Sequence, residues 1–574
     1  MVDPKQWLAA RTYTAEKLEQ ARLILDEVRN GEPAGEAVRH HPLPSGGYVA
    51  KHVLVHLYNQ LVNQGKWEED PALLEAIRMK PVRTLSGVTT VTVLTKPYPC
   101  PGNCIFCPTE DCEPKSYLSD EPGARRALQN QFDPYAQVMS RLQALQAVGH
   151  PTDKIELLIL GGTFTAYRRD YQAWFVERCF AAMNQTQVPP LPGADDPARD
   201  IPAWQSQAVP PLEESQARLS TAHTANISSS HRNVGLVLET RPDEITYPEL
   251  AWLRSLGATK LQVGAQSLDD RLLQMNRRGH TVEQTIQAML RMRAAGFKVV
   301  LHWMPNLLGA TPESDALDFK KLWGDAEQNG GLCPDEIKIY PTQLLKNAEL
   351  YQYYLRGEYQ PYSEQQLVQL LAEVKSLIPP YCRVNRVIRD IPSTNVVDGN
   401  RRTSLRLDVL QEMQRRGQAC QCIRCREVGS TQVDAETLIF QDLVYSPQIL
   451  PGEASSTEHF LSFNTPANQL AGYLRLSLPG ETPAGRDAAL PDLAGAAIVR
   501  EVHVFGQSLA VGSGQAGAAQ HIGLGTQLIT RAAELARQAG YERLAVISAI
   551  GTRAYYQKRG FTQGEAYQVM PLNR

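Results

Sequence analysis

Three features that would place a chain in a broad class are missing from this sequence. Its 574 residues hold no run of about eighteen apolar residues, and the N-terminal stretch lacks the apolar core of a signal peptide. A formal net charge of -3 gives no general basic character, so any surface for nucleic acid must be local. We therefore expect a cytoplasmic protein of about three to four domains that makes no contact with a membrane.

Cysteine is scarce and unevenly placed. Six of the ten cysteines fall in two short clusters, which suits metal binding in a reducing compartment better than a disulfide framework. The first cluster, Cys100, Cys104 and Cys107, follows an alternating apolar run at 88–94 that predicts a strand.

Three thiolates on one loop can bind three irons of a four-iron, four-sulfur (4Fe-4S) cluster. The fourth iron is then open to the amino and carboxylate groups of S-adenosylmethionine (SAM), whose cleavage gives a 5'-deoxyadenosyl radical. Because Cys112 follows close behind, a structural zinc site held by four thiols stays open as the alternative.

Apolar strands alternate with helical segments from residue 88 onward, which favours a parallel sheet of the partial (β/α) barrel type. The expected strands are 88–96, 155–162, 234–239, 260–266, 298–304, 336–340 and 383–388. In such barrels chemistry gathers at the carboxyl ends of the strands. From these ends we assign to SAM the set Gly161, Gly162, Thr163, Glu239, Arg241 and Gln266. Later strands end near His302, Lys338 and Tyr340.

Composition divides the chain further. Residues 1–85 predict a helical module, and 86–395 form the expected barrel. Within the barrel we expect 185–232 to be a mobile insertion, because it is rich in proline and in small polar residues. An arginine-rich, zinc-binding linker over 396–435 then precedes a last domain over 436–574.

Arginine is concentrated in one stretch. Residues 383–426 carry ten arginines against four acidic residues, an excess that suits phosphate. We expect an RNA-binding surface there that includes Arg401 and Arg402. A face whose arginines pair with acids of a neighbouring domain is the alternative. A second basic group closes the helical module: Arg78, Lys80 and Arg83.

The second cysteine cluster lies inside the arginine-rich stretch. Cys420, Cys422 and Cys425 have the spacing C-x-C-x2-C and no strand before them, which is typical of a structural zinc site. We take Cys382 as the fourth ligand, with Cys333 as the second choice.

The last domain predicts strands at 471–478, 498–505 and 543–549 and helices at 523–538 and 552–559. The first helix opens with Gln520-His521-Ile522-Gly523-Leu524-Gly525-Thr526. Backbone amides at such a glycine-opened helix start can bind pyrophosphate. A strand before this loop and a tyrosine pair after it are the order expected of an acetyl-CoA-binding acyltransferase of the GNAT type.

Together these segments resemble one family, the catalytic subunit of Elongator, which carboxymethylates the wobble uridine of tRNA. Its members join a radical SAM domain to a GNAT-like domain. The resemblance covers nearly the whole chain outside 185–232. It rests on six segments: Lys80-Pro81-Val82-Arg83-Thr84, Gly161-Gly162-Thr163-Phe164, Glu239-Thr240-Arg241-Pro242-Asp243, Arg389-Asp390-Ile391-Pro392, Arg426-Glu427-Val428-Gly429 and Gly551-Thr552-Arg553-Ala554-Tyr555-Tyr556.

The resemblance implies a radical SAM partial barrel, a GNAT-like α/β domain and an N-terminal helical module that binds tRNA. Cys100, Cys104 and Cys107 would hold the cluster. The candidate catalytic residues are Lys154, Tyr555 and Tyr556. Lys154 precedes its strand, which conflicts with the carboxyl-end rule. The acetyl-CoA site would comprise Lys154, Glu501, Val502, His503, Val504, Leu524, Gly525, Thr526 and Tyr556.

The short first gap in the cysteine motif resembles the bacterial and archaeal forms of the family. Those forms act without the other Elongator subunits, and we expect the same here. The reaction needs an external electron donor. The oligomeric state stays open, with a homodimer among the options.

The implied activity is a tRNA uridine acetyltransferase that forms 5-carboxymethyluridine. The radical would take hydrogen from the acetyl methyl, the resulting carbon radical would add to uridine C5, and water would release CoA. The base must be presented unstacked. The alternative function is a protein lysine acetyltransferase whose GNAT domain attacks the thioester carbonyl directly, with an iron-sulfur site that is only structural.

Overall fold

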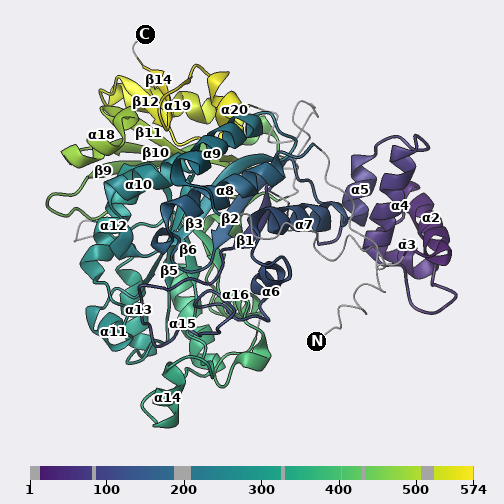
Figure 1. Ribbon diagram of the computed structural model, residues 1–574, viewed down its shortest axis with the longest axis horizontal. Helices are drawn as coiled ribbons and strands as arrows, with labels where there is room; N and C mark the ends of the chain where they lie inside the picture. The colour runs from purple at the N-terminus through teal and green to yellow at the C-terminus, as the bar shows by residue number, and fades with distance from the viewer. Residues whose placement is uncertain are drawn as a thin grey trace.

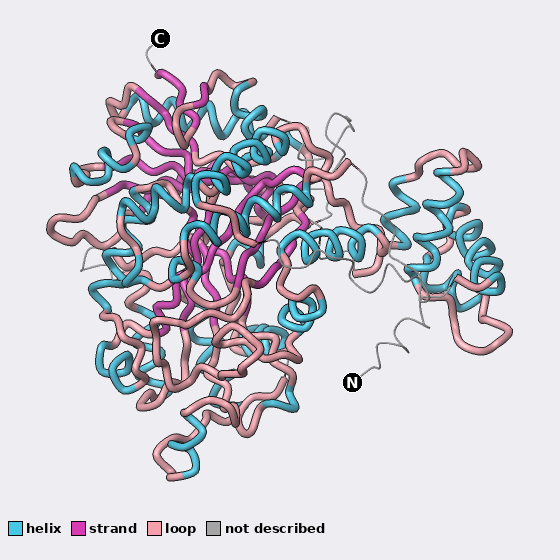
Figure 2. Tube along the Cα trace, in the orientation of Figure 1, coloured by secondary structure: helices cyan, strands magenta, loops and turns pink. Residues whose placement is uncertain are grey.

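The computed structural model describes residues 13–80, 84, 86–186, 208–324, 330–402, 404–429, 433–505 and 523–572. A helical group, an open parallel sheet with its helices and a mixed sheet follow one another along the chain (Figure 1). The helical group stands to one side of the two sheets (Figure 2). Among the described helices, none combines the length and apolar content that crossing a bilayer requires.

The helical group has a small core of its own. Its helices are α2 (Ala15–Arg29), α3 (Ala34–His40), α4 (Lys51–Asn63) and α5 (Pro71–Ile77). Thr14 caps α2 and Asp70 caps α5 through side-chain oxygens that accept from backbone amides. Apolar residues at helical spacing, such as Ile24 and Leu54, are fully buried between the helices. The group is tied to the barrel by Arg78, whose Nε donates to the Gly149 carbonyl at 2.7 Å.

The parallel sheet is an open barrel of seven strands in chain order, and every neighbouring pair is parallel. The strands are β1 (Thr89–Leu94), β2 (Lys154–Leu160), β3 (Arg232–Thr240), β4 (Lys260–Gln266), β5 (Lys298–Trp303), β6 (Glu336–Ile339) and β7 (Arg383–Arg386). Each predicted strand is confirmed to within two residues at either end. The edge strands β1 and β7 do not pair with each other, so the prediction of a partial barrel is confirmed.

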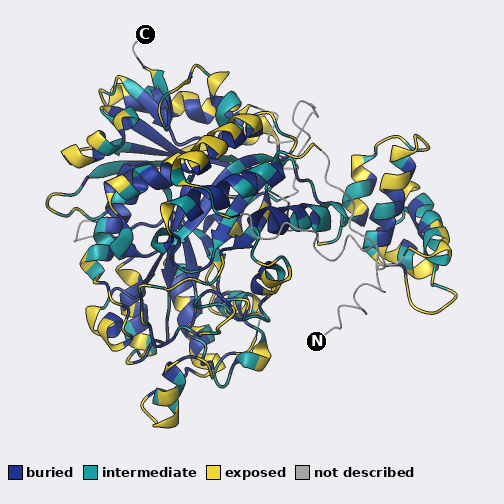
Figure 3. Cartoon of the chain, viewed as in Figure 1, coloured by how far each residue is buried: buried dark blue, intermediate teal, exposed yellow. Residues whose placement is uncertain are grey.

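Helices follow the strands and cover the outside of this sheet, leaving its central strands buried (Figure 3). The helices of this part of the chain are α6 (Pro122–Gln129), α7 (Pro134–Gln146), α8 (Arg169–Met183), α9 (Leu212–Asn226), α10 (Tyr247–Ser255), α11 (Asp270–Met275), α12 (Val282–Ala294), α13 (Pro312–Lys320), α14 (Leu350–Leu355), α15 (Glu364–Ser376), α16 (Leu405–Arg415) and α17 (Ile423–Arg426). Of these, α14 lies away from the sheet (Figure 1). Short 3-10 turns add η2 (Phe164–Ala166), η4 (Pro242–Glu244) and η5 (Ser393–Asn395).

The helix α9 corrects the prediction that 185–232 lacks order. It packs on α8 and buries Leu219 and Ala222. Asn226, also buried, donates to the His231 carbonyl at 3.1 Å and accepts from the Asn233 amide at 2.7 Å, which fixes the entry into β3. The small residues that suggested disorder lie on α9, where they allow this helix to pack closely on α8. Residues 187–207 lie outside the described part of the chain.

The mixed sheet has the order β13-β14-β12-β11-β10-β9-β8. Its strands are β8 (Ile439–Tyr445), β9 (Ser456–Asn464), β10 (Leu470–Pro479), β11 (Ala496–Val504), β12 (Arg543–Val546), β13 (Thr562–Gln563) and β14 (Gln568–Pro571). The helical elements are η6 (Ala435–Thr437), α18 (Ala484–Ala489), η7 (Pro491–Leu493), α19 (Leu524–Gln538), η8 (Ile550–Thr552) and α20 (Arg553–Gln557). All strands and helices predicted for this domain are confirmed, and β8, β9, β13 and β14 are additional.

The mixed sheet lies against the amino ends of the barrel strands. Asp335, which precedes β6 and is fully buried, binds Arg500 of β11 at 2.7 Å and Arg475 of β10 at 3.3 Å. The β10–β11 register shifts by one residue at Arg500, and this bulge turns both Arg500 and Glu501 toward the barrel. Burial would raise the pKa of Asp335, but the two guanidinium groups hold it well below its usual value. The junction is therefore a buried, charge-matched interface.

Candidate functional site

The cysteine loop follows β1 at the carboxyl end of the barrel, as the sequence predicts. Cys104 is buried and Cys100 and Cys107 are half-buried. Two backbone bonds fix the loop: the Ile105 amide donates to the Asn276 carbonyl at 3.3 Å, and its carbonyl accepts from the Leu350 amide at 2.8 Å. Backbone bonds to two segments distant in sequence thus fix the position of the cysteine loop.

The electrostatics of the loop favour thiolate. A hydrogen bond with Cys107 lowers the pKa of Cys104 to about 5 against the effect of burial, and the positive charges of Arg278 and Arg241 lower it further. The same contact with Cys104, together with burial, raises the pKa of Cys107. Thiolate is the form that binds iron, so one of these two thiols is prepared for a metal.

The spacing of the thiols distinguishes the two metal hypotheses for this loop. A single tetrahedral ion needs its ligand atoms close together. No three of the thiols of Cys100, Cys104, Cys107 and Cys112 meet within 4.8 Å, although Cys420, Cys422 and Cys425 do so elsewhere in the described residues. In a 4Fe-4S cluster each thiolate binds a different iron, so the first three residues fit that cluster better than a single zinc ion.

The glycines at the end of β2 bring this strand against the cysteine loop. Gly161 and Gly162 have φ of +133° and +91°, where only glycine is unstrained. A Cβ on Gly161 would clash with the Thr95 hydroxyl. The Thr163 hydroxyl then lies 3.8 Å from the Cys100 sulfur. The end of β2 therefore brings its backbone close to the thiols of the cysteine loop.

Two predicted SAM residues carry unused polar atoms. Arg241 is buried, and its Nη2 donates to Asp243 at 2.8 Å and to the Arg278 carbonyl at 3.1 Å, but its Nη1 has no protein partner. Gln266 has a positive φ of 71° and an unpartnered, buried Oε1. An unpaired buried polar atom costs about 1 to 3 kcal/mol, so these atoms fit a site that a polar ligand such as SAM completes.

Inside the barrel, next to its carboxyl end, the inner face is polar. The Oε1 of Gln262 accepts from both Lys338 and the imidazole of His302, the latter at 3.1 Å. Burial, and then the charge of Lys338, lowers the pKa of His302 well below its usual value, so the ring is neutral. Glu239 accepts from the Tyr117 hydroxyl at 3.4 Å, and burial raises its pKa. Sequence reasoning missed Gln262 and Tyr117, because neither belongs to a recognisable motif.

The polar lining continues to the amino ends of the strands. Lys260 lies between Glu156 at 2.7 Å and Glu336 at 3.2 Å. Burial alone would lower the pKa of Lys260, but these carboxylates raise it above its ordinary value. Barrel interiors are usually filled by branched apolar side chains. This one instead encloses charged groups around open space.

One cavity of about 970 Å³ joins the two ends of the barrel. At the carboxyl end it is lined by Cys107, Glu239, Gln266, His302 and Tyr340. At the amino end it is lined by Lys298, Glu501, Val502, His503 and Tyr556. Residues predicted for SAM and residues predicted for acetyl-CoA therefore share a single space.

The mixed sheet opens toward this cavity where β11 and β12 separate. Their parallel pairing ends at Val499 and Val546, so the carboxyl half of β11 has no strand partner on that side among the described residues. Burial lowers the pKa of His503 to about 4, so its imidazole is neutral, and its Nε2 meets no partner in the described part of the chain. A gap of this kind between two parallel strands can receive an extended ligand arm.

The start of α19 lies beside the same gap. Its cap, Gly523, has φ of +73°. The Thr526 amide donates to the Gly523 carbonyl at 2.9 Å, whereas the amides of Leu524 and Gly525 at the first turn of the helix can face a ligand. A Cβ on Gly525 would clash with the Tyr555 hydroxyl, so glycine permits the close approach of that tyrosine. Tyr556 lines the cavity, whereas Tyr555 does not. Residues 520–522 lie outside the described part.

Comparisons with known proteins cover nearly the whole chain. Residues 98–319 match the radical SAM superfamily, 334–415 a radical SAM C-terminal domain and 441–561 the acetyltransferase (GNAT) family. The tRNA uridine(34) acetyltransferase of Dehalococcoides mccartyi is 37% identical over 86% of this chain and 99% of that relative. Elongator complex protein 3 of Homo sapiens is 33% identical over 87% of each.

This chain belongs to the Elongator complex protein 3 family. The solved structure of archaeal Methanocaldococcus infernus Elp3 with an N-terminal deletion superposes with a TM-score of 0.67 and 33% identity, over 85% of this chain and 99% of that one. The radical SAM and GNAT domains, and the family predicted from the sequence, are confirmed.

The family lysine, Lys154, is the first residue of β2. It pairs in register with Arg232 of β3, and a Cβ on Gly551 would clash with Arg232, so the 551–556 segment of the GNAT domain lies against this end. Lys154 thus lies at the amino end of the barrel, which is the end that the GNAT domain covers. Burial lowers the pKa of Lys154. Lys154 does not line the shared cavity, and its role stays a prediction.

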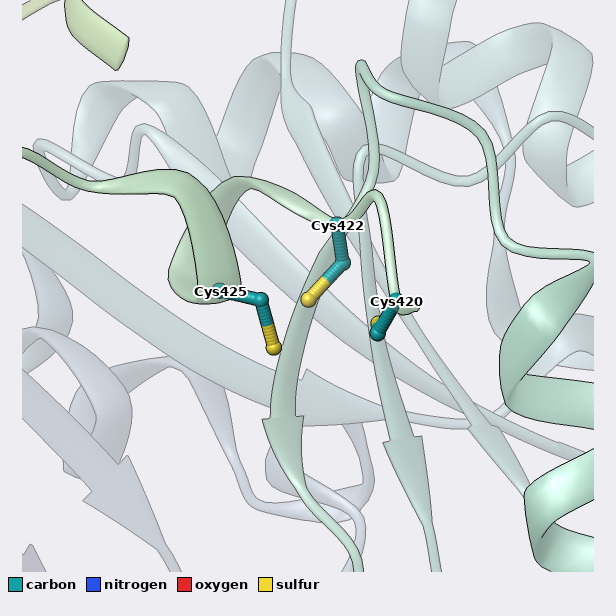
Figure 4. Close-up of side chains that lie close together, drawn as sticks. All are labelled: Cys420, Cys422 and Cys425. Carbon is teal, nitrogen blue, oxygen red and sulfur yellow. The ribbon is translucent and has the colours of Figure 1, made fainter. Parts of the chain in front are cut away.

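The second cysteine cluster is compact. The thiols of Cys420, Cys422 and Cys425 lie within 4.8 Å of one another and point to a common centre (Figure 4). This donor set fits zinc. Cys382 is buried beside the cluster, where its carbonyl accepts from the Ile423 amide at 2.9 Å, but its thiol is not part of the group.

Most arginines of the 383–426 stretch bind partners within the chain. Arg389 pairs with Glu121 at 2.8 Å, and Arg416 pairs with Glu412 at 2.7 Å. Arg402 is exposed but lies 3.3 Å from Glu364. Arg401 is exposed, and its side chain donates to the Val397 carbonyl at 2.6 Å. Of the second basic group, Arg78 binds the Gly149 carbonyl, Lys80 has a positive φ of 55°, and Arg83 lies outside the described residues.

Proposed function

We propose that this protein is a tRNA uridine acetyltransferase that uses SAM and acetyl-CoA to form 5-carboxymethyluridine at the wobble position. Relatives named tRNA uridine(34) acetyltransferase and Elongator complex protein 3 cover most of the chain at 33–37% identity, which supports this assignment. The proposal places the protein in the cytoplasm, with an external electron donor and without other Elongator subunits.

The observation that carries the proposal is the single cavity through the barrel. Residues that border the gap between β11 and β12 line one end of it, and residues of the cysteine loop line the other. An acetyl group bound between β11 and β12 therefore faces the interior of the radical SAM domain. A thioester held there is separated from bulk solvent by the two domains.

The same geometry argues against a protein lysine acetyltransferase. A general base works best with a pKa near the working pH. Glu501 is the carboxylate at the GNAT gap, but Lys298, Arg475 and Tyr473 all bind it. Burial would raise the pKa of Glu501, yet these partners hold it well below its usual value. The barrel also covers the side from which an acceptor lysine would approach.

Each part of the chain then has a role in the proposed reaction. When bound, a 4Fe-4S cluster with SAM supplies the radical that takes hydrogen from the acetyl methyl. Cys100, Cys104 and Cys107 would hold the cluster, with Arg241 and Gln266 toward SAM. The β11 segment 501–504 and the start of α19 would hold acetyl-CoA.

The remaining groups orient substrates. Neutral His302 and Lys338 both hydrogen-bond to Gln262, and all three side chains line the cavity. They can hold the acetyl carbonyl or the uracil oxygens in place. We propose that Cys420, Cys422 and Cys425 bind a structural zinc ion between the domains, and that Arg401 contacts tRNA.

An anaerobic assay with methyl-deuterated acetyl-CoA, SAM, tRNA and dithionite tests the proposal. We expect deuterium in 5'-deoxyadenosine and a carboxymethyl group on the tRNA. The matched control is a Cys104→Ala variant, which should form neither product. Acetyl transfer to a protein lysine in air, without SAM and with intact acetyl deuterium, would identify the alternative enzyme instead.

A further inference from the structure

A buried arginine far from the cysteine motif in sequence touches one of its sulfurs. Arg278 lies 174 positions after Cys104, and its Nη1 donates to the Cys104 sulfur at 3.7 Å. Its side chain is 7% exposed. The other arm of the guanidinium binds the Gly264 carbonyl, through Nη2 at 2.7 Å and Nε at 3.3 Å. The positive charge is thus fixed in one orientation beside the thiol.

The surroundings of Arg278 are built to accommodate it. A Cβ on Gly264 would clash with its guanidinium, and a Cβ on Gly102 would clash with the neighbouring Arg241. The Arg241 side chain in turn donates to the Arg278 carbonyl at 3.1 Å. Two glycines therefore leave room for two cations at the inner side of the cysteine loop. Apolar side chains at these positions would also bury the loop, but they would place no positive charge beside it.

We propose that Arg278 is a positioning residue that sets the reduction potential of the cluster through its hydrogen bond and charge at the Cys104 sulfur. The inference rests on the proposed function only in placing a 4Fe-4S cluster at Cys100, Cys104 and Cys107. Hydrogen bonds to the sulfurs and nearby charge are among the factors that set such potentials. Reduction adds one electron to the cluster, and a fixed cation stabilises that added negative charge. Loss of Arg278 should therefore make the cluster harder to reduce.

The experiment is a potentiometric titration of the reconstituted full-length protein under anaerobic conditions. Dithionite supplies the electron, and the electron resonance signal of the reduced cluster reports its fraction. Three variants are compared with the unchanged protein: Arg278→Gln, which loses the charge, Arg278→Lys, which keeps the charge but loses the fork, and Arg277→Gln. Arg277 is the matched control, because it is exposed and paired with Glu349 at 2.9 Å, away from the thiols. Iron and sulfide contents are measured for each.

We expect the midpoint of Arg278→Gln to be more negative than that of the unchanged protein, with Arg278→Lys between them and Arg277→Gln unshifted. Equal midpoints at equal iron content would overturn the inference. If Arg278→Gln takes up no iron, the Arg278→Lys variant tests the inference instead. Its midpoint potential must also be more negative than that of Arg277→Gln. The titration omits tRNA and acetyl-CoA, so it is independent of the RNA reaction. An unchanged protein that assembles no reducible cluster would instead overturn the proposed function.

Discussion

The Lys298 ammonium at the start of β5 pairs with the Glu501 carboxylate of β11, across the junction of the barrel and the GNAT sheet. The Tyr473 hydroxyl donates to the same carboxylate at 2.8 Å, and the Arg475 Nε does so at 2.9 Å. This carboxylate therefore stays ionised through neutral pH. Both partners line the shared cavity, so the pair joins the domains and borders the proposed path of the acetyl group.

Replacing Lys298 with methionine keeps the apolar stem and removes the charge. Loss of a hydrogen bond to a charged group should lower the free energy of unfolding by about 2 kcal/mol. Guanidinium chloride unfolding followed by circular dichroism measures the change. Lys320→Met on the exposed end of α13 is the control. Equal midpoints for the two variants would contradict a stabilising role for the pair.

Thr259 offers a way to obstruct the cavity near the amino ends of the barrel strands. Its side chain lines the cavity just before β4. We expect Thr259→Trp to bind acetyl-CoA nearly as before, because the GNAT gap is unaltered, but to lose tRNA modification by on the order of 100-fold. Isothermal titration and nucleoside analysis measure the two properties. Thr221→Trp on the exposed side of α9 is the control. Unimpaired tRNA modification by Thr259→Trp would show that the acetyl group travels by another route.

Much of the barrel could be predicted from the sequence, because its strands are short apolar runs that end in glycine or polar residues. The cysteine loop, Arg241 and Gln266 were placed at strand ends in this way, and they lie at the ends of β1, β3 and β4. Strand β8 was not, since every residue from Ile439 to Val444 is exposed and no alternation of polarity marks it. The junction was also missed. A charged residue at a strand start, such as Lys298 or Asp335, has the same pattern in sequence whether it meets solvent or another domain.

Arg278 illustrates a second limit. Nothing in its neighbourhood in the sequence marks it, because its partner Cys104 is brought to it only by the curvature of the sheet and by the turn after α11. Contacts between strand-end loops that are far apart in sequence depend on topology. Patterns along the chain carry no signal for them.

Asp315 predicts a dependence of stability on pH. Its buried carboxyl accepts from the Asn306 amide at 2.7 Å and the Tyr362 hydroxyl at 2.8 Å, and burial raises its pKa to about 7. The folded state therefore keeps a proton that the unfolded state loses at a pKa of about 3.9. Between these values the carboxyl lowers stability as pH rises, by at most about 1.4 kcal/mol per unit.

The measurement is the difference in unfolding free energy between the unchanged protein and Asp315→Asn from pH 4 to pH 8. The amide does not titrate, so this difference should move against the unchanged protein as pH rises toward 7 and then level off. Asp390→Asn, at an exposed ion pair with Arg386, is the control. A difference that stays constant with pH would mean that Asp315 has an ordinary pKa.

Removal of one thiol tests the second cysteine cluster. Cys422→Ser should lose most of the zinc that the unchanged protein carries after purification, because structural sites need four ligands. Cys112→Ser, at an exposed thiol outside the cluster, should retain it. Metal analysis by mass spectrometry gives zinc per chain. Cys382→Ser then tests the fourth ligand, and an undiminished zinc content in that variant would exclude Cys382.

Arg401 is an exposed arginine of the 383–426 stretch that has no acidic partner among the described residues and donates to the Val397 carbonyl. Its neighbour Arg402 lies near both Glu364 and Asp408, so Arg401 is freer to meet phosphate. We expect Arg401→Gln to weaken tRNA binding and to reduce the slope of log K against log salt by about 0.7 for one contact to a single-stranded loop. Fluorescence anisotropy at several salt concentrations measures this slope.

The control for that measurement is Arg415→Gln, because Arg415 is also exposed but pairs with Glu412 at 2.8 Å. If general positive charge were responsible, both variants would flatten the slope equally. A local phosphate contact instead predicts a change for Arg401→Gln alone. An unchanged slope in both variants would move the tRNA surface away from this stretch, since the remaining arginines already satisfy acids and carbonyls within the chain.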